Sequence, residues 1–278
     1  MNKAESVTTD HNGIAAEVLA TWDRREQMGS LSQRETGLDL RSAYQVAAAV
    51  RRLREARGER VVGRKIGFTN TTIWAEYGVG APIWGYVYDR TLHKLEEIGG
   101  RFDLSSLVEP RIEPEIMFGL SRAPEPGMDE WALLSCIDWV AQGFEIVQSL
   151  FPGWRFTAAD TVAAFGLHGA LLVGTQVLVR AQNARELHDA LGGFEITLRR
   201  EGDVADHGLA SNVLAGGPLA ALRHLVEVLA ADPTAPALQA GEIISTGTVT
   251  RALPIASGES WSTSLTGIPL AGASIRFS

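Results

Sequence analysis

A chain of 278 residues that is 45% hydrophobic can bury a large core, as one domain or as a main domain with a smaller appendage. The formal net charge of −8 and the lack of Lys/Arg-rich blocks argue against nucleic acid as a partner. The single cysteine, Cys136, excludes an intrachain disulfide and a thiolate zinc cluster, which suits a reducing cytoplasm.

Membrane and export signals are not predicted either. The stretch from Met1 to Gly13 is polar and lacks the apolar core of a signal peptide, and no later run reaches the ~18 apolar residues of a membrane span. We therefore expect a soluble cytoplasmic protein without a membrane partner.

Two helices are predicted near the N-terminus. The first carries apolar residues at helical spacing, namely Ile14, Val18, Leu19 and Trp22. The second begins after Asp39, a favourable N-cap, and ends near Gly58. Its solvated face is predicted to consist of Arg51, Arg52 and Arg54. Residues 1–60 are thus expected to form a small helical region.

A strand-like run over residues 61–68 follows, and it carries Lys65. Asn70 then predicts the start of a short helix that ends at Gly78. Glycines and prolines between Gly78 and Gly85 indicate a loop that could cover a site. A lysine within a strand usually lies at an edge or on the surface, so Lys65 alone is weak evidence for a function.

Two carboxylates stand two residues apart in an apolar run, at Glu113 and Glu115. Because successive side chains of a strand alternate between faces, both should point the same way. Paired carboxylates repel each other unless they are protonated, well solvated or bridged by a cation. A hard divalent cation such as Mg2+ or Mn2+ takes oxygen ligands of this kind. An ordinary solvent-facing strand is the alternative.

A third glutamate shares this setting. The segment Asp129–Gln142 predicts a helix with Trp131 and Leu134 turned inward, and it leads into a strand-like run over 144–147 that carries Glu145. If the two strands are neighbours, Glu145 completes a site of three carboxylates. Burial of three such charges would be too costly without a cation.

A histidine lies between glycines in the segment Phe165–Gly169. The unperturbed pKa of an imidazole, near ~6.5, would suit His168 as a general base. The alternative is a hydrogen bond from His168 to a backbone carbonyl.

The rest of the chain predicts strands and tight turns around one helix. Strands are expected over 171–179, 194–199, 242–245 and 273–277 and from Trp261, with a hairpin turn at Glu201–Asp203 and a helix over Pro218–Ala231. We find no phosphate loop, GxSxG elbow or HExxH motif. A β-rich domain over residues 61–278 explains the many short strands better than a doubly wound sheet does.

Five segments carry a resemblance to a known family: Gly63–Gly67 (GRKIG), Glu109–Ile116 (EPRIEPEI), Phe144–Ser149 (FEIVQS), Asp160–Ala163 (DTVA) and Gly241–Gly247 (GEIISTG). Together they resemble the hydratase/decarboxylase branch of the fumarylacetoacetate hydrolase superfamily. The resemblance spans nearly the whole chain. It implies an α+β fold with a rolled, β-rich mixed sheet and a small helical N-terminal region, assembled as a homo-oligomer.

The resemblance also implies a site. Glu113, Glu115 and Glu145 would hold Mg2+ or Mn2+, and Lys65 matches an active-site lysine that adds positive charge or relays a proton. The implied reaction adds water to an unsaturated 2-oxo acid from aromatic-compound catabolism through a metal-bound enolate, as in 2-keto-4-pentenoate hydratases. This small 2-oxo acid would be the binding partner.

Substrate contacts are predicted at the turn formed by Thr246 and Gly247 and at Arg251. The guanidinium of Arg251 matches the geometry of a carboxylate and could bind the distal end of a diacid substrate. A surface salt bridge is the alternative for Arg251.

One position departs from the family pattern. Leu167 and His168 stand where members of this branch have a small Ser/Cys-type pair. An imidazole there keeps an acylpyruvate C–C hydrolase of the maleylpyruvate or fumarylpyruvate type open, with His168 as the water-activating base, beside a 4-oxalocrotonate-type decarboxylase. A metal-stabilised binding module without turnover is the remaining alternative, and Lys65 argues against it because binding needs no proton relay.

Overall fold

The computed structural model describes residues 9–278, so residues 1–8 of the polar stretch considered for a leader lie outside the described range. Its centre is a mixed sheet of eight strands. In spatial order these are β2 (Ile83–Tyr88), β1 (Val61–Gly67), β10 (Ile243–Thr248), β5 (Arg111–Leu120), β6 (Ile137–Val147), β7 (His168–Leu178) and β3 (Leu92–Lys94), with β11 (Leu253–Pro254) paired to β5. The pairs β1–β10 and β3–β7 are parallel, and the other pairs are antiparallel.

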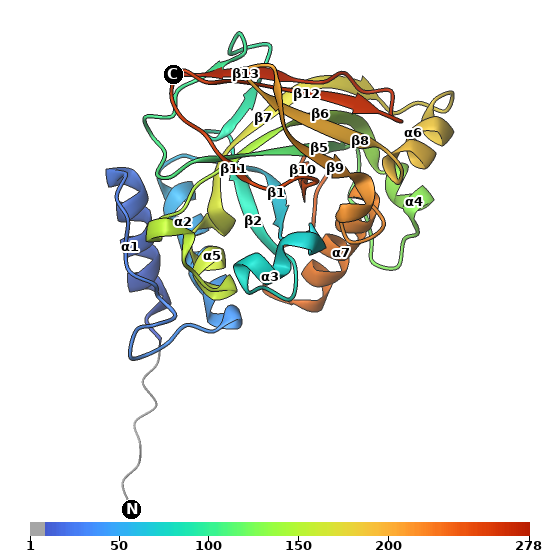
Figure 1. Ribbon diagram of the computed structural model, residues 1–278. Coiled ribbons are helices and arrows are strands. Elements are labelled where there is room, and N and C mark those ends of the chain that lie inside the picture. Colours follow the sequence, from blue (N-terminus) through green and yellow to red (C-terminus); the bar gives the residue numbers. More distant parts are fainter. Residues whose placement is uncertain (1–8) are drawn as a thin grey trace, which may run out of the picture.

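A second sheet packs over one end of the first and lies at the top of Figure 1. Its five strands, in spatial order, are β4 (Arg101–Phe102), β13 (Ser274–Phe277), β12 (Ser260–Thr266), β8 (Glu195–Arg200) and β9 (Asp203–Leu209). The predicted turn at Glu201 and Gly202 joins β8 to β9 as an antiparallel hairpin. Side chains from both sheets, such as Phe144 and Trp261, form one hydrophobic cluster between them.

Helices cover the outside of the main sheet. They are α1 (His11–Arg24), α2 (Leu40–Ala56), α3 (Trp74–Tyr77), α4 (Glu130–Leu134), α5 (Ala158–Ala163), α6 (Ala184–Leu191) and α7 (Pro218–Ala231), with short 3-10 turns at Thr71–Ile73, Pro152–Trp154, Phe165–Leu167 and Ala210–Asn212. Helices α1, α2 and α5 lie together on one side (Figure 1). The N-cap predicted at Asp39 is confirmed, because its carboxylate accepts a hydrogen bond from Ser42 N at 2.7 Å. This α+β architecture with a curled mixed sheet confirms the predicted fold class.

The helix predicted over Asp129–Gln142 is wrong. Helix α4 ends at Leu134, and β6 begins at Ile137. Trp131, predicted to point inward, is 46% exposed and stacks on His188. The segment becomes a strand because it lies between β5 and β7, where the two ladders satisfy its backbone groups and its bulky apolar residues are buried on the sheet. Such pairing overrides a local helical spacing.

The predicted solvated face of α2 also needs a correction. Arg54 is buried, 3% exposed, and its Nε lies 2.8 Å from a carboxylate oxygen of Glu59. Its guanidinium stacks 3.8 Å from the centre of the Tyr88 ring. A buried guanidinium requires a carboxylate and an aromatic face of this kind, and neither is visible in the spacing of the arginines.

No helix among residues 9–278 combines the length and apolar character needed to cross a membrane.

Candidate active site

Neighbouring strands bring the three glutamates together. Glu113 and Glu115 share one face of β5, and the antiparallel register of β5 with β6 places Glu145 directly opposite Glu113. One carboxylate oxygen from each residue lies within 4.8 Å of the other two. The sequence placed Glu145 in the cluster only if its strand neighbours that of Glu113 and Glu115. The two strands are neighbours, so this condition is met.

The burial of these groups perturbs their ionisation. Glu115 and Glu145 are fully buried, and Glu113 is partly exposed. Burial raises the pKa of Glu113 to about 7 and the pKa of Glu115 well above its usual range, and the charge of Glu145 adds to both shifts. For Glu145 burial acts in the same direction, but Lys65 and His168 outweigh it and lower the pKa of Glu145.

Two carboxylate oxygens of the cluster lack hydrogen-bond partners among the described residues. These are Glu115 Oε1 and Glu145 Oε2, both buried, although Lys65 Nζ lies 3.2 Å from the latter. A buried anionic oxygen without a partner is costly. Three converging carboxylates with unused oxygens are the ligand set that Mg2+ and Mn2+ prefer, so the residues present fit a divalent cation.

Lys65 is buried beside this cluster, because β1 is an interior strand between β2 and β10. Its Nζ donates a hydrogen bond to Gly166 O at 3.0 Å. Burial alone favours the neutral amine, but the charges of Glu145, Glu113 and Glu115 outweigh it and raise the pKa of Lys65. The ammonium is therefore held charged in the site.

Residues within strand β10 hold Glu115 in place, at the position where the sequence predicted a turn. Ser245 Oγ donates a short hydrogen bond to Glu115 Oε2, and Gly247 N donates to the same oxygen at 2.8 Å. The backbone of Gly247 has φ +91°, and a Cβ there would meet Thr69 Oγ1. Thr246 Oγ1 donates instead to the backbone of β5, at Ile116 O. The sequence analysis did not identify Ser245 as a site residue. A hydroxyl that directly follows two isoleucines at the start of β10 is the pattern that could have indicated it.

His168, the first residue of β7, is fully buried with both ring nitrogens engaged. Nδ1 lies 2.8 Å from Glu145 Oε1, and Nε2 lies 2.9 Å from the hydroxyl of Thr91. Burial lowers the pKa of His168 and outweighs the attraction of Glu145. Because the carboxylate only accepts, the network assigns a hydrogen to Nδ1, and the hydroxyl of Thr91 is the partner of Nε2. Thr91 carries no sequence signal.

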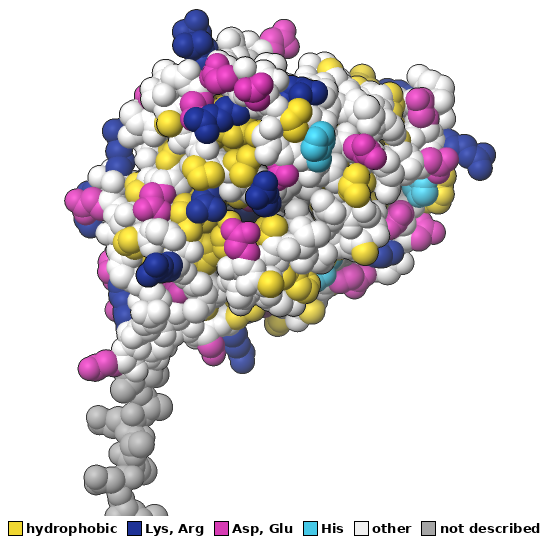
Figure 2. Space-filling view, viewed as in Figure 1, with side chains coloured by type: hydrophobic (Ala, Val, Ile, Leu, Met, Phe, Trp, Pro, Cys, Tyr) yellow, Lys and Arg dark blue, Asp and Glu magenta, His cyan; other side chains and the backbone are white. Residues whose placement is uncertain are grey.

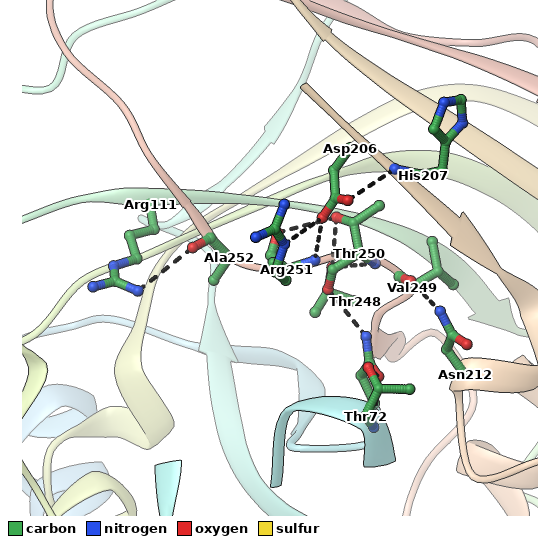
Figure 3. Close-up of polar contacts among 11 residues, drawn as sticks. Thr72, Arg111, Asp206, His207, Asn212, Thr248, Val249, Thr250, Arg251 and Ala252 are labelled. Carbon is green, nitrogen blue, oxygen red and sulfur yellow. Dashed lines mark hydrogen bonds and ion pairs between the residues drawn. The ribbon is translucent and has the colours of Figure 1, made fainter. Parts of the chain in front are cut away.

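Arg251 lies on the loop after β10, beside Asp206 (Figure 3), and is not among the residues that line the pocket described below. Its Nε pairs with Asp206 Oδ2 at 3.1 Å, and its side chain is 59% exposed. This carboxylate raises the pKa of Arg251. Its predicted contact with a distal substrate carboxylate stays a prediction.

A pocket opens above the glutamates and Lys65. Its polar floor includes Lys65, Glu113 and Gly247. Its walls are largely apolar and aromatic and include Phe68, Ile73, Tyr77, Val147, Trp154, Leu167 and Ala252. Such a pocket suits a small, flat, conjugated acid whose polar end reaches the carboxylates.

The metal-free protein is expected to lose stability as the pH rises. Because burial raises the pKa of Glu113 from 4.5 to about 7, the folded state binds this proton more tightly than the unfolded state. The resulting stabilisation is complete below pH 4.5 and is lost as the pH rises through about 7. Glu113 alone accounts for up to about 3 kcal/mol. The free energy of unfolding of the metal-free protein is measured across this pH range by urea denaturation in the presence of a chelator.

The Glu113→Gln variant is the control, and its stability should depend less on pH over the same range. Saturating Mn2+ should reverse the trend in the unmodified chain, because a cation favours ionised carboxylates. A stability difference between the unmodified chain and Glu113→Gln that does not change between pH 4.5 and 7 would contradict the assignment.

Comparison with known proteins gives the family of the chain. No protein-family model matches it. The chain is 32% identical over 219 residues to 4-oxalocrotonate decarboxylase of Pseudomonas sp. strain CF600, covering 78% of each sequence. It is 31% identical over 235 residues to 2-hydroxyhexa-2,4-dienoate hydratase of Comamonas testosteroni, covering 84% of each.

A solved structure supports the same relationship. The 4-oxalocrotonate decarboxylase of Pseudomonas putida G7, complexed with magnesium and adipate, superimposes with a TM-score of 0.85 and 26% identity, covering 96% of this chain and 97% of that one. These relatives include both hydratases and decarboxylases, as the five sequence segments predicted. The chain belongs to the family of the 4-oxalocrotonate decarboxylases and 2-hydroxydienoate hydratases, the hydratase/decarboxylase branch that the five segments resemble.

Proposed function

We propose that this chain is a divalent-metal-dependent enzyme that adds water to an unsaturated 2-oxo acid. The observation that carries the proposal is the buried cluster of Glu113, Glu115 and Glu145 with the Lys65 ammonium 3.2 Å from Glu145. Relatives named as hydratases, at about 30% identity, support the hydration of a 2-hydroxydienoate or 2-keto-4-pentenoate.

The proposed roles follow from position. The three glutamates would hold Mg2+ or Mn2+, which supplies Lewis-acid stabilisation of negative charge on the 2-oxo group. Lys65, charged and buried at the pocket floor, would donate a proton or stabilise the enolate of the substrate. Gly247 and Ser245 keep Glu115 oriented, and the apolar walls exclude water from the conjugated chain.

Decarboxylation is the second candidate. A 4-oxalocrotonate decarboxylase matches the chain over almost its whole length, and the loss of CO2 from a 2-oxo diacid passes through the same enolate. The C–C hydrolase alternative rested on His168 and Arg251. In the structure both nitrogens of His168 have partners and Arg251 pairs with Asp206, so neither residue supports it further.

The product of the reaction distinguishes the hydratase, decarboxylase and C–C hydrolase candidates. Mn2+-loaded protein would be incubated in parallel with a 2-hydroxydienoate, an oxalocrotonate and a maleylpyruvate, followed by mass analysis. A product heavier by one water supports the hydratase, loss of CO2 supports the decarboxylase, and release of free pyruvate supports the hydrolase. No metal-dependent product from any of the three would contradict the proposal and favour a binding module.

His168 is proposed to position Glu145 rather than to activate water. The His168→Gln variant is expected to raise the Mn2+ concentration needed for half-maximal activity about 10- to 100-fold, because Glu145 loses the donor that orients it. Turnover at saturating Mn2+ should change far less. Thr91→Val should act in the same direction, since it removes the hydrogen-bond partner of Nε2. A fall of ~10²-fold or more at saturating metal would instead identify His168 as the base.

We propose that residues 61–278 form the catalytic domain, because the site residues come from β1, β5, β6, β7 and β10. Residues 1–60 would be an appended helical region. The homo-oligomer, the cytoplasmic location and the lack of nucleic-acid and membrane partners rest on the sequence and the resemblance alone.

A further inference from the structure

The proposed mechanism does not use Arg111, a cation that contacts residues of the pocket lining. Arg111 is the first residue of β5, and the alternation of the strand puts it on the same face as Glu113 and Glu115. Its Nη1 donates to the hydroxyl of Tyr77 at 2.9 Å and lies 3.5 Å from Ala252 O, a contact seen in Figure 3. Tyr77 and Ala252 both line the pocket, so the guanidinium lies directly beside its lining.

The guanidinium of Arg111 is held in place but not neutralised. It stacks 4.1 Å from the centre of the Trp154 ring, another pocket residue. Among residues 9–278 no carboxylate lies at ion-pair distance from it, and its Nε and Nη2 groups donate no hydrogen bond to these residues. Arg111 is only half-buried, so these two groups remain accessible to a ligand. A fork with two free donors matches a carboxylate.

The aromatic platform under Arg111 is built with backbone strain. Trp154 has φ +60° and Glu109 has φ +45°, left-handed conformations that are unfavourable for side-chain-bearing residues. The indole Nε1 of Trp154 donates to Glu109 O at 3.0 Å, which fixes the ring. Such outliers cluster at ligand sites, where the surrounding structure compensates their cost.

The spacing along β5 matches a short dicarboxylate. Arg111 and Glu113 are two residues apart, about 7 Å along the strand, and Glu115 is about 7 Å further. The terminal carboxyl carbons of a six-carbon diacid are roughly 6 to 7 Å apart. The apolar walls at Val147 and Leu167 would cover the chain between the two ends. On the face shown in Figure 2, hydrophobic side chains likewise gather near the centre with basic ones among them.

We infer that Arg111 is the specificity-determining residue that binds the distal carboxylate of a dicarboxylate 2-oxo acid, whichever reaction the site then performs. The inference rests on the proposed function, since the 2-oxo end would face the glutamates. It assigns to Arg111 the role that the sequence suggested for Arg251. A substrate with one carboxylate would leave the Arg111 fork without a partner.

The test compares substrates and ligands that differ only at the distal carboxylate. For Arg111→Gln, kcat/KM for 2-oxohex-3-enedioate should fall about 10- to 100-fold, mainly through KM, while kcat/KM for a 2-oxo monocarboxylate of equal length stays unchanged. Adipate binding to the Mn2+-loaded protein, measured by calorimetry, should weaken by the same factor, and hexanoate binding should not change. Arg111→Lys should retain part of the preference, because it keeps the charge but not the fork.

Arg199→Gln is the matched control, since Arg199 is also half-buried and has no ion-pair partner among the described residues, but lies on β8. Equal losses on both substrates for Arg111→Gln, or a lost preference in Arg251→Gln instead, would overturn the inference. If Arg111→Gln does not fold, Arg111→Lys carries the comparison. Lack of turnover in the unmodified chain would refute the proposed function only, because adipate binding still tests Arg111.

Discussion

Lys65→Met is expected to lower turnover by about 10²- to 10⁴-fold without weakening the binding of Mn2+. The ammonium is buried, lies 3.2 Å from Glu145 Oε2 and has a raised pKa, so it can stabilise or protonate an enolate at the pocket floor. The same charge repels a cation held by the glutamates. Its removal should therefore leave Mn2+ affinity equal or higher, while the chemical step slows.

Two measurements separate these effects. Single-turnover kinetics at saturating Mn2+ reports the chemical step, and calorimetric titration of the metal-free protein reports affinity. Lys94→Met is the control, because Lys94 is exposed and pairs with Glu97 on the surface. If Lys65→Met weakened Mn2+ binding and activity returned with more metal, Lys65 would be a structural residue of the metal site.

Glu115→Gln is expected to abolish both metal binding and turnover, yet to leave the metal-free protein as stable as before or more stable. Glu115 is fully buried, and burial raises its pKa well above the usual range, so its ionised form opposes folding. An amide keeps an oxygen for Ser245 and Gly247 but replaces the other ligand oxygen by an NH2 group. The variant should lose the thermal stabilisation by Mn2+, about 2.7 kcal/mol at 100 times Kd.

Glu242→Gln provides a control of opposite sign. Glu242 is also mostly buried, but it neutralises the buried guanidinium of Arg64 at 2.7 Å. This substitution should destabilise the metal-free protein, because it leaves Arg64 without its counterion, and should keep the response to Mn2+. Thermal unfolding with and without Mn2+ measures both variants. A Glu115→Gln protein that Mn2+ still stabilises would exclude Glu115 as a ligand.

Local patterns were sufficient for much of the fold. Helix α7 occupies the predicted range Pro218–Ala231, because its apolar face follows the helical period. The leucines of that face, Leu219, Leu222, Leu225 and Leu229, are buried. The cap at Asp39 and the hairpin turn at Glu201 and Gly202 also depend on neighbours in sequence. The strand after α4 was not predicted, because a central strand that is buried on both faces along most of its length has no clear two-residue period.

The sequence by itself determined which chemistry the chain could carry. Glu113 and Glu115 two residues apart in a strand must share a face, and a carboxylate pair in an apolar run indicates a cation. The tertiary structure decided how that chemistry is assembled. Strand register places Glu145 opposite Glu113, and strand β10, 130 residues away in sequence, supplies the Ser245 hydroxyl to Glu115.

The same distinction explains Arg111 and Arg251. Both are arginines near the site motifs, and nothing local separates them. Packing leaves Arg111 half-buried and stacked on Trp154 beside the pocket. Arg251 instead pairs with Asp206 at the surface. Side-chain periodicity is a property of a single segment and can be read from the sequence. Ligand geometry, desolvation and charge pairing depend on which segments become neighbours. Only the folded chain defines these neighbours.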